Sequence, residues 1–410
     1  MIFGSIAALI RGLCIDLCGK PQFVVYEEPG QAAVDGLIPW NAMVLSAGQD
    51  EDNETMVDCI RRAYSEWEKT EPPIKETGKV MLPSCVALCD NNNISAFFWI
   101  DSDFDAVQKR LVEKDASPRT EMIVREEAVV NTHTRAEVLK NRIVLVTGGA
   151  QGVGEEIAIN LAAGGALVFI ADINLEGARK LVKTINEAEK RTAALALKVN
   201  VSDEASVMAM CNTLAEKSGG LDLCVSNAGV LMAGSALEQE LEEFKFVTEV
   251  NYTAFFIISK HAARLMRLQH RTAPRWKTDI IQINSKSGLE GSNRNGAYAG
   301  GKFGGIGLTA SFALELVEYN IKVNAICPGN FLDSPLWSDP EKGLFVQYLK
   351  AGKAPDAKNI ADVRAYYESR VPMKRGCTGK DLARAIYYIV EQEYETGQAV
   401  PVTGGQIMLH

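Results

Sequence analysis

Tyr298 and Lys302 are the residues whose types and spacing most directly indicate proton transfer. They stand four positions apart in a stretch of helical composition, so they share one face of a helix. An ammonium group beside a phenol stabilises the phenolate, and this lowers a phenol pKa that is ordinarily about 10. The pair therefore predicts an acid/base centre in which Tyr298 exchanges the proton.

A hydroxyl group stands thirteen residues before Tyr298, where Ser285 ends the apolar run DIIQIN at 279–284. A hydroxyl at the end of a strand can hydrogen-bond a reacting oxygen while a neighbouring phenol exchanges its proton. Ser285 is therefore the predicted substrate-orienting group. Ser287 is the rival for this role.

A glycine-rich turn, TGGAQGVG at 147–154, directly follows the first strong apolar run and precedes a helical stretch. Glycines let the chain turn tightly and bring backbone N–H groups against a pyrophosphate at a helix N-terminus. The next apolar run ends at Asp172, where a carboxylate accepts hydrogen bonds from the ribose hydroxyls and repels a 2′-phosphate. The pattern predicts NAD in preference to NADP, and the nicotinamide cation would join Lys302 in lowering the pKa of Tyr298.

Seven short apolar runs separated by helix-length segments place these groups. Such runs are typical of strands buried on both faces of a parallel sheet. We predict an α/β fold with a doubly wound, Rossmann-type, seven-stranded sheet over residues 138–410. The runs are 143–149, 166–173, 195–201, 221–229, 279–285, 321–329 and 399–405.

Residues 1–137 are predicted to form a smaller α/β domain or an ordered arm, joined near Thr134–Asn141. They carry 13 basic and 23 acidic residues, so the acidity of the chain belongs to this segment. Its expected elements are a core element at Ile2–Ile10, too short for a membrane span, two strands around a turn at 91–93, and a helix behind Asp103. The strands are VALCD at 86–90 and ISAFFWI at 94–100, and the helix spans 103–115.

The charge and the cysteine and histidine counts of the chain limit the classes of partner that we expect. The net charge of −9 and the lack of a dense Lys/Arg stripe argue against nucleic acid. Nine cysteines, an odd number, favour a reducing cytoplasm, and the pairs Cys14/Cys18 and Cys85/Cys89 are interpreted as buried thiols. The four histidines are scattered, so no metal site is expected. The remaining partner class is a small-molecule substrate.

Several motifs in order give a resemblance to the short-chain dehydrogenase/reductase family, although Ser226, Asn200 and Asn284 depart from its pattern. The motifs are Thr147-Gly-x-x-x-Gly-x-Gly, Ser226-Asn227-Ala228-Gly229, Asn251, Ser285, Tyr298-x-x-x-Lys302 and Pro328-Gly329. The resemblance implies a homo-oligomer, either a dimer or a tetramer, in which Asn251 holds a water beside Lys302. It also implies cofactor contacts from Thr147, Gly148, Gln151, Gly152, Val153, Gly154, Asp172, Ile173, Asn200, Val201, Asn227, Ala228, Gly229, Tyr298, Lys302, Pro328 and Gly329.

Four stretches are similar to those of family members that act on sugar-alcohol phosphates: IIQINSKSG, KFGGIGLT, MKRGC and VTGGQIM. This resemblance implies NAD-dependent interconversion of a sugar-alcohol phosphate and a keto-sugar phosphate, of the sorbitol 6-phosphate/fructose 6-phosphate type. Binding the phosphate group of such a substrate requires cationic side chains. The candidates for it are Lys286, Arg294, Lys374 and Arg375, and the expected substrate contacts are Ser285, Lys286, Ser287 and Arg375.

Residues 330–372, rich in Pro, Gly and aromatic side chains, are predicted to form a lid over the substrate, with Ser334 near the nicotinamide amide. Two alternatives remain open at this stage. One is an NAD-linked dehydrogenase of unphosphorylated polyols or other secondary alcohols. The other is a non-catalytic NAD-binding regulatory or assembly protein that recruits a partner through its acidic front segment.

Overall fold

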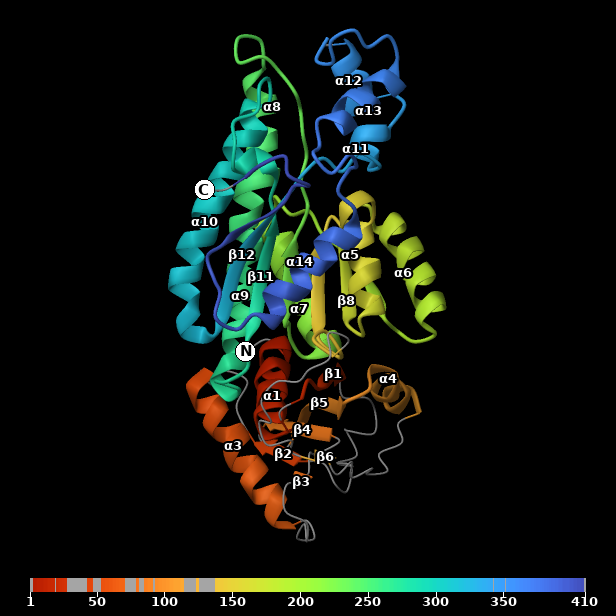
Figure 1. The fold of residues 1–410 in the computed structure, drawn as a ribbon. Coiled ribbons are helices and arrows are strands. Elements are labelled where there is room, and N and C mark those ends of the chain that lie inside the picture. Colours follow the sequence, from red (N-terminus) through yellow and green to blue (C-terminus); the bar gives the residue numbers. More distant parts are fainter. Residues whose placement is uncertain are drawn as a thin grey trace.

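The structure is a computed structural model. It describes residues 3–18, 20–27, 43–46, 53–70, 79–80, 85–90, 93–113, 123–124, 137–341, 343–350 and 352–408. Its largest feature is a seven-stranded, wholly parallel sheet with helices on both faces (Figure 1). The expected Rossmann-type architecture is therefore confirmed.

The main sheet has the strand order β13-β12-β11-β10-β7-β8-β9, and each strand coincides with one of the seven apolar runs. The strand order reverses its direction at β7 and β10, so a crevice forms outside the carboxyl ends of the strands. The strands are β7 (Ile143–Thr147), β8 (Leu167–Asp172), β9 (Ala194–Lys198), β10 (Leu223–Ser226), β11 (Thr278–Ile283), β12 (Ile321–Pro328) and β13 (Ala399–Val402).

Alternate side chains of β7 belong to two different hydrophobic cores, one on each face of the main sheet. Ile143 and Leu145 pack on the side of α7 (Glu204–Ser218), α9 (Ala254–Thr272) and α10 (Gly296–Leu316). Val144 and Val146 pack on the side of α5 (Gly152–Ala163), α6 (Leu175–Glu189) and α14 (Gly379–Glu391). Successive side chains of a strand point to opposite faces, which explains why this run is apolar throughout.

The front segment contains a four-stranded sheet of order β1-β5-β4-β2. The strands expected at 86–90 and 94–100 are present as β4 and β5, and Asp103 caps α4 by accepting from the amides of Asp105 and Ala106. Asn91 and Asn92 of the expected turn lie outside the described residues. The elements are α1 (Phe3–Cys18), β1 (Phe23–Glu27), β2 (Met43–Ser46), α3 (Asn53–Thr70), β3 (Lys79–Val80), β4 (Cys85–Asp90), β5 (Asn93–Asp101), α4 (Phe104–Glu113) and β6 (Ile123–Val124).

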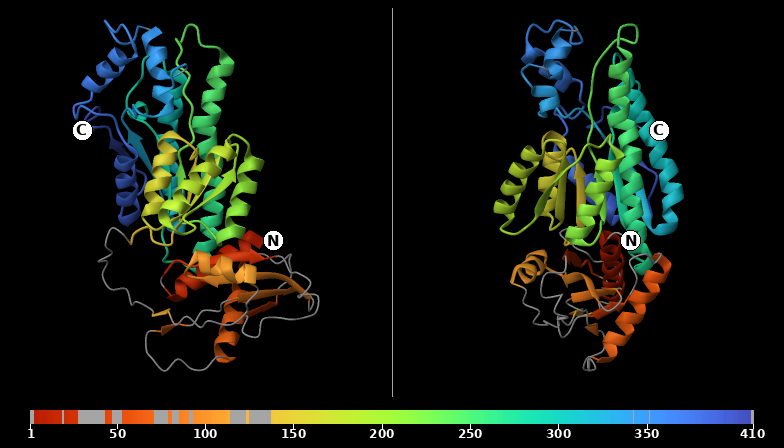
Figure 2. Two further views of the ribbon diagram at one scale, coloured as in Figure 1. Left: turned by 90° about the vertical axis from the view of Figure 1, so that its right-hand side faces the viewer. Right: turned by 180° about the vertical axis from the view of Figure 1, so that it is seen from behind.

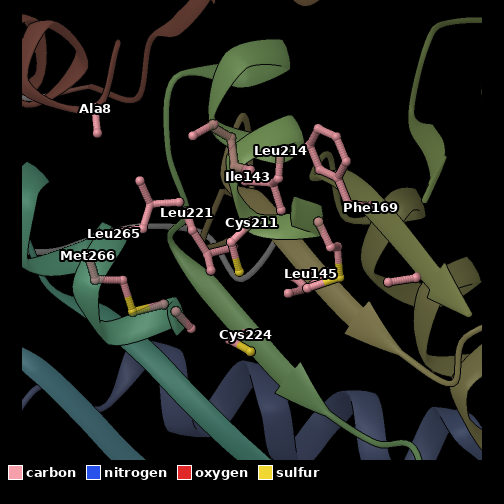
Figure 3. Close-up of a cluster of buried hydrophobic side chains, with 14 of the residues drawn as sticks. Ala8, Ile143, Leu145, Phe169, Cys211, Leu214, Leu221, Cys224, Leu265 and Met266 are labelled. Carbon is pink, nitrogen blue, oxygen red and sulfur yellow. The ribbon is translucent and has the colours of Figure 1, made fainter. Parts of the chain in front are cut away.

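Helix α1 lies between the front sheet and the main domain, beside α7 and α9 (Figures 1 and 2). Most of its buried residues join the front core with α3, whereas Ala8 belongs to the main core together with Leu265 and Met266 (Figure 3). The apolar start of the chain is therefore a core element, as predicted. Helix α1 lies at the end of the main domain where the strands begin (Figure 1).

A fully buried ion pair crosses this junction. Arg11 donates from both Nη atoms to Asp222, at 3.0 and 2.7 Å, and from Nε to the Gln22 carbonyl oxygen. The Asp222 carboxylate also accepts from the Ile143 amide and from Trp276 Nε1. Burial opposes ionisation of Asp222, but the Arg11 guanidinium outweighs it and holds the pKa of Asp222 below its ordinary value. Each nitrogen of the guanidinium and each oxygen of the carboxylate therefore has a hydrogen-bond partner, as a buried ion pair requires.

Two further expectations concern thiols and the membrane. Cys14 and Cys85 are buried, as interpreted, while the side chains of Cys18 and Cys89 lie outside the described residues. Within the described ranges, no helix combines the length and the apolarity that crossing a bilayer requires.

We expect Arg11→Ala to lower the free energy of unfolding by about 3–5 kcal/mol, because it leaves the Asp222 carboxylate buried without its cation. Denaturant unfolding followed by circular dichroism measures this loss. Arg61→Ala is the matched control, since Arg61 is exposed and its loss should cost under about 0.5 kcal/mol. The double variant Arg11→Met/Asp222→Asn should recover part of the stability. An Arg11 variant as stable as the control would contradict the role given to the pair.

Candidate active site

An open cleft of about 1250 Å³ lies at the carboxyl ends of the main strands. Its walls are the glycine-rich turn, the residues that follow β8 to β12, and the segment that contains α11 (Pro335–Ser338), α12 (Leu344–Lys350) and α13 (Ile360–Ser369). These three helices lie at the end of the molecule opposite to the front segment (Figure 1). The cleft is thus in the place where doubly wound folds bind their ligands.

The glycine-rich turn is shaped to receive a phosphate group. Gly148 and Gly152 have φ near +60°, a conformation that other residues rarely adopt. A Cβ at Gly154 would clash with the Gly148 carbonyl oxygen and with Asn227 Nδ2. Asn227 Nδ2 donates to the carbonyl oxygens of Thr147 and Gly148, both at 3.0 Å. The backbone at the N-terminus of α5 is therefore open and fixed, which fits a dinucleotide pyrophosphate.

Thr147 does not line the cleft, contrary to expectation. Its side chain is completely buried, and its Oγ1 accepts from the amides of Asn227 and Ala228. The residue joins the end of β7 to the end of β10, so it positions the turn and leaves the ligand contacts to its neighbours.

The two acceptors expected at the adenosine end both line the cleft. Asp172 accepts from the amides of Ala150 and Asn174 at 3.0 and 2.8 Å, so its carboxylate caps the strand end and orients the glycine turn. A carboxylate has about four lone-pair sites, and two remain for ribose hydroxyls. Asn200 is exposed, and its Oδ1 accepts from the Ser202 amide at 3.2 Å.

The remaining expected cofactor residues follow the same edge of the sheet. All of them except Thr147 line the cleft, which brings the turn, the β8 end and the β10 and β12 ends together. They are Gln151, Val153, Ile173, Val201, Ala228, Gly229, Pro328 and Gly329.

Tyr298, Lys302 and Ser285 meet at the other end of the cleft. Lys302 Nζ lies 5.6 Å from the centre of the Tyr298 ring and donates to the Ile283 carbonyl oxygen at 2.9 Å. Burial lowers the pKa of Lys302 to about 8. The Ser285 hydroxyl hydrogen-bonds Tyr298, while Ser285 Oγ accepts from the Ser287 amide at 3.1 Å. The structure thus places Ser285 against the phenol, and Ser287 orients Ser285.

The pKa of Tyr298 is raised above its ordinary value, whereas the sequence predicts that it is lowered. Burial is the main cause of the raised pKa. The hydrogen bond from Ser285 lowers the pKa of Tyr298, whereas the electrostatic effects of Tyr348 and Cys327 raise it further. The protein by itself therefore favours the protonated phenol. In this form Tyr298 can donate a proton to a ketone oxygen.

Two buried asparagines fix the backbone around this centre. Asn251 lies in a π-helical turn (Glu249–Thr253), and its amide group donates to the Val230 carbonyl oxygen at 2.7 Å and accepts from the Val230 amide at 2.9 Å. Asn284, one of the departures from the family pattern, donates to the Lys302 carbonyl oxygen and accepts from the Ser285 amide. Asn284 therefore ties the helix of Tyr298 to the strand end that carries Ser285.

The cationic candidates divide into two groups. Lys286 and Arg294 line the cleft. Lys374 and Arg375 do not: Lys374 donates to the Ser369 carbonyl oxygen, and Arg375 pairs with Asp381 at 2.6 Å beside the start of α14. The expected substrate contact of Arg375 is therefore replaced by a capping role, because a bidentate carboxylate already fills its guanidinium.

Sequence reasoning missed several cleft residues that the α11–α13 segment supplies. Lys353 and Arg370 are cations, and Trp337, Tyr348 and Tyr367 are aromatic. Tyr348 is buried, hydrogen-bonded to Asn295, and near enough to Tyr298 to raise its pKa. The clustering of aromatic and basic residues from 345 to 370 is the signal that could have identified them. Ser334, which was predicted, also lines the cleft, and its Oγ donates to the Phe331 carbonyl oxygen.

Comparison with known proteins places this arrangement in a family. Residues 142–342 match the family model for short chain dehydrogenases. The chain is 36% identical over 274 residues to sorbitol-6-phosphate 2-dehydrogenase of Escherichia coli (strain K12), covering 65% of this chain and 99% of the relative. The chain belongs to the short-chain dehydrogenase/reductase family. Members bind NAD(P), and this chain is an alcohol dehydrogenase with a small-molecule substrate.

Two further relatives illustrate the range of substrates in the family. The crystal structure of sorbitol-6-phosphate 2-dehydrogenase SrlD from Erwinia amylovora superposes with a TM-score of 0.60 at 37% identity, covering 65% of this chain and all of that one. Meso-2,3-butanediol dehydrogenase of Serratia marcescens is 29% identical over 254 residues, covering 59% of this chain and 96% of that enzyme.

We expect Gly154→Ala to weaken NAD binding, because the added methyl group must displace the Gly148 carbonyl and Asn227. Overpacking of this kind costs about 1–3 kcal/mol, or roughly 5- to 150-fold in affinity. Isothermal titration calorimetry with NAD measures it. Gly291→Ala is the control, since a Cβ there meets no atom within 4 Å. Equal NAD affinity of the two variants would contradict the position of the pyrophosphate.

Proposed function

We propose that this dehydrogenase uses NAD to interconvert a sugar-alcohol phosphate and a keto-sugar phosphate, with sorbitol 6-phosphate and fructose 6-phosphate as the preferred pair. The observation that carries the proposal is the charge of the cleft. Among the described residues that line it, four are cations besides Lys302, and only Asp172 and Glu249 are carboxylates. The cations are Lys286, Arg294, Lys353 and Arg370. Such a surface favours an anionic substrate over a neutral polyol.

The preference for NAD over NADP rests on Asp172. Its carboxylate lies in the cleft at the end of β8, beside the glycine turn. A 2′-phosphate there would meet this negative charge. The neighbouring residue Ile173 is apolar and 68% exposed, so it offers the phosphate no counter-charge.

In the proposed mechanism three side chains handle the reacting oxygen. Ser285 donates a hydrogen bond to that oxygen and holds it beside Tyr298. In the direction of oxidation, the Tyr298 oxygen takes the proton of the substrate hydroxyl as the carbonyl bond forms. NAD, when bound, supplies the acceptor for the hydride that leaves the carbinol carbon, together with a positive charge beside the phenol. Lys302 stabilises the phenolate before the reaction, and afterwards a water held by the Asn251 turn passes the proton that Tyr298 has gained to the solvent.

The raised pKa of Tyr298 gives the mechanism a pH dependence. Reduction needs the protonated phenol and oxidation needs the phenolate. Because the folded protein favours the protonated form, the rate of oxidation should increase as the pH rises from neutrality toward about 8, above which Lys302 loses the charge that stabilises the phenolate, and the rate of reduction should not increase.

We also propose that residues 1–137 form an accessory domain that stabilises the dehydrogenase domain at 138–410. The continuous core through Ala8 and the buried Arg11–Asp222 pair support this. Unfolding of the Arg11→Ala variant tests it as well. The whole chain should unfold at lower denaturant concentration in one transition, and an early separate transition of the front segment would contradict the coupling.

The chain is further proposed to form a homo-oligomer, a dimer or a tetramer, in the cytoplasm. Exposed aromatic side chains along neighbouring helices support self-association: Phe244 on α8 (Leu241–Thr248), Phe256 on α9 and Phe303 on α10 are each more than 40% exposed. Light scattering on the purified protein measures the mass, and a monomer would contradict this part of the proposal.

A substrate panel tests the reaction itself. With NAD, we expect turnover of sorbitol 6-phosphate, followed by NADH absorbance, at a kcat/KM far above that for sorbitol or for the same reaction with NADP. Tyr298→Phe should lower kcat at least about 100-fold and leave NAD affinity largely unchanged, because the ring is kept and the proton exchange is lost. Failure of every hexitol phosphate would reject the substrate, and an active Tyr298→Phe variant would reject the mechanism.

A further inference from the structure

We propose that Lys286 and Arg370 together form the phosphate-binding clamp of the cleft and that they account for its selection of phosphorylated substrates. The two residues come from separate elements, the short 3-10 helix after β11 (Lys286–Gly288) and the C-terminus of α13. Both line the cleft. The assignment rests on the proposed function, because it names the groups that hold the phosphate of that substrate.

Lys286 lies beside the reaction centre without a fixed partner. It directly follows Ser285, so their Cα atoms are about 3.8 Å apart. Its side chain is half-buried, and within the described part of the chain it makes no hydrogen bond or ion pair. Burial lowers the pKa of Lys286, the exposed Glu290 opposes this, and the positive charge of Arg370 adds to it. An incompletely neutralised ammonium group facing a cleft is stabilised by an anionic ligand.

Arg370 differs from the neighbouring arginines in its partners. Arg364 pairs with Asp333 and Glu368, and Arg375 pairs with Asp381. Among the described residues no carboxylate pairs with Arg370; its Nη1 donates to the Tyr366 hydroxyl oxygen at 2.7 Å, and its guanidinium lies 5.4 Å from the centre of that ring. The ring therefore orients the guanidinium, while Nε and Nη2 remain for a ligand. A planar fork of this kind suits two oxygens of a phosphate.

The two cations repel each other across the cleft, and a phosphate would remove that cost. At neutral pH a phosphate monoester carries about −1.5 to −2 charges, which matches one lysine and one arginine. Of the other two cleft cations, Lys353 has partners that Lys286 lacks. Lys353 Nζ donates to the Asn293 carbonyl oxygen at 3.1 Å and lies 4.3 Å from the centre of the Tyr348 ring. We therefore assign the phosphate to Lys286 and Arg370 rather than to Lys353 and Arg294.

The decisive measurement compares sorbitol 6-phosphate with sorbitol in the full-length enzyme. Lys286→Ala and Arg370→Ala should each lower kcat/KM for sorbitol 6-phosphate by roughly 10- to 100-fold, the effect of losing a charged hydrogen bond. Activity on sorbitol, however low, should change less than about threefold. The ratio of the two kcat/KM values is therefore the readout, and a general loss of folding would lower both alike.

Three further variants sharpen the assignment. Arg370→Lys should keep part of the discrimination, because it retains the charge without the fork. Lys353→Ala tests the rival assignment of the phosphate to Lys353 and Arg294. If this variant loses more of the discrimination between sorbitol 6-phosphate and sorbitol than the Lys286 and Arg370 variants do, the proposal is overturned. Lys374→Gln is the matched control for net charge, since Lys374 lies four residues from Arg370 but outside the cleft.

A binding experiment separates this proposal from the proposed reaction. If the wild-type enzyme oxidises no hexitol phosphate, the proposed function fails, yet the clamp is still tested by titrating the NADH-loaded enzyme with inorganic phosphate and with fructose 6-phosphate. Binding of these probes to the wild type and to Lys374→Gln, with at least tenfold weaker binding to the Lys286 and Arg370 variants, supports the clamp. No phosphate binding by the wild type, or equal binding by all variants, overturns it.

Discussion

Lys302 carries its charge in a place that water hardly reaches, and two hydrogen bonds hold it there. Its ammonium group donates to the carbonyl oxygen of Ile283, and its own carbonyl oxygen accepts from Asn284. Both partners belong to the end of β11, from which Ser285 follows. The same contacts therefore hold the helix of Tyr298 against the strand end that carries the orienting hydroxyl. Without this double connection, the phenol, the hydroxyl and the ammonium group would have no fixed relation to one another.

Much of the fold and the chemical centre could be predicted from the sequence. The seven apolar runs predict the strands because a strand buried on both faces must be apolar throughout. The phenol and the ammonium group could be paired because a helix brings residues four apart to one face. The glycine-rich turn could also be predicted from the sequence, because few residues other than glycine adopt the required backbone angles.

The sequence could not predict what depends on distant contacts. The sequence predicts that Thr147 and Arg375 contact the ligand. In the structure Thr147 accepts from the backbone that follows β10, and Arg375 pairs with Asp381. Neither partner can be identified from the spacing of residues along the chain. The pKa of Tyr298 also depends on burial and on groups far along the chain, such as Tyr348, whose electrostatic effect raises it. In the front segment, β4 and β5 could be predicted because two apolar runs flank a polar turn, whereas β1, β2 and α3 have no such flanking signal.

The front segment and the cleft occupy opposite ends of the same strands. Helix α1 lies where the main strands begin, since its Arg11 bonds Asp222 directly before β10, and the reacting groups gather where the strands end. The acidic extension can therefore accumulate substitutions, or acquire a binding partner of its own, without altering the shape that a substrate encounters. Such changes would act on how long the enzyme survives in its native form, so selection on durability and selection on specificity can proceed separately in this chain.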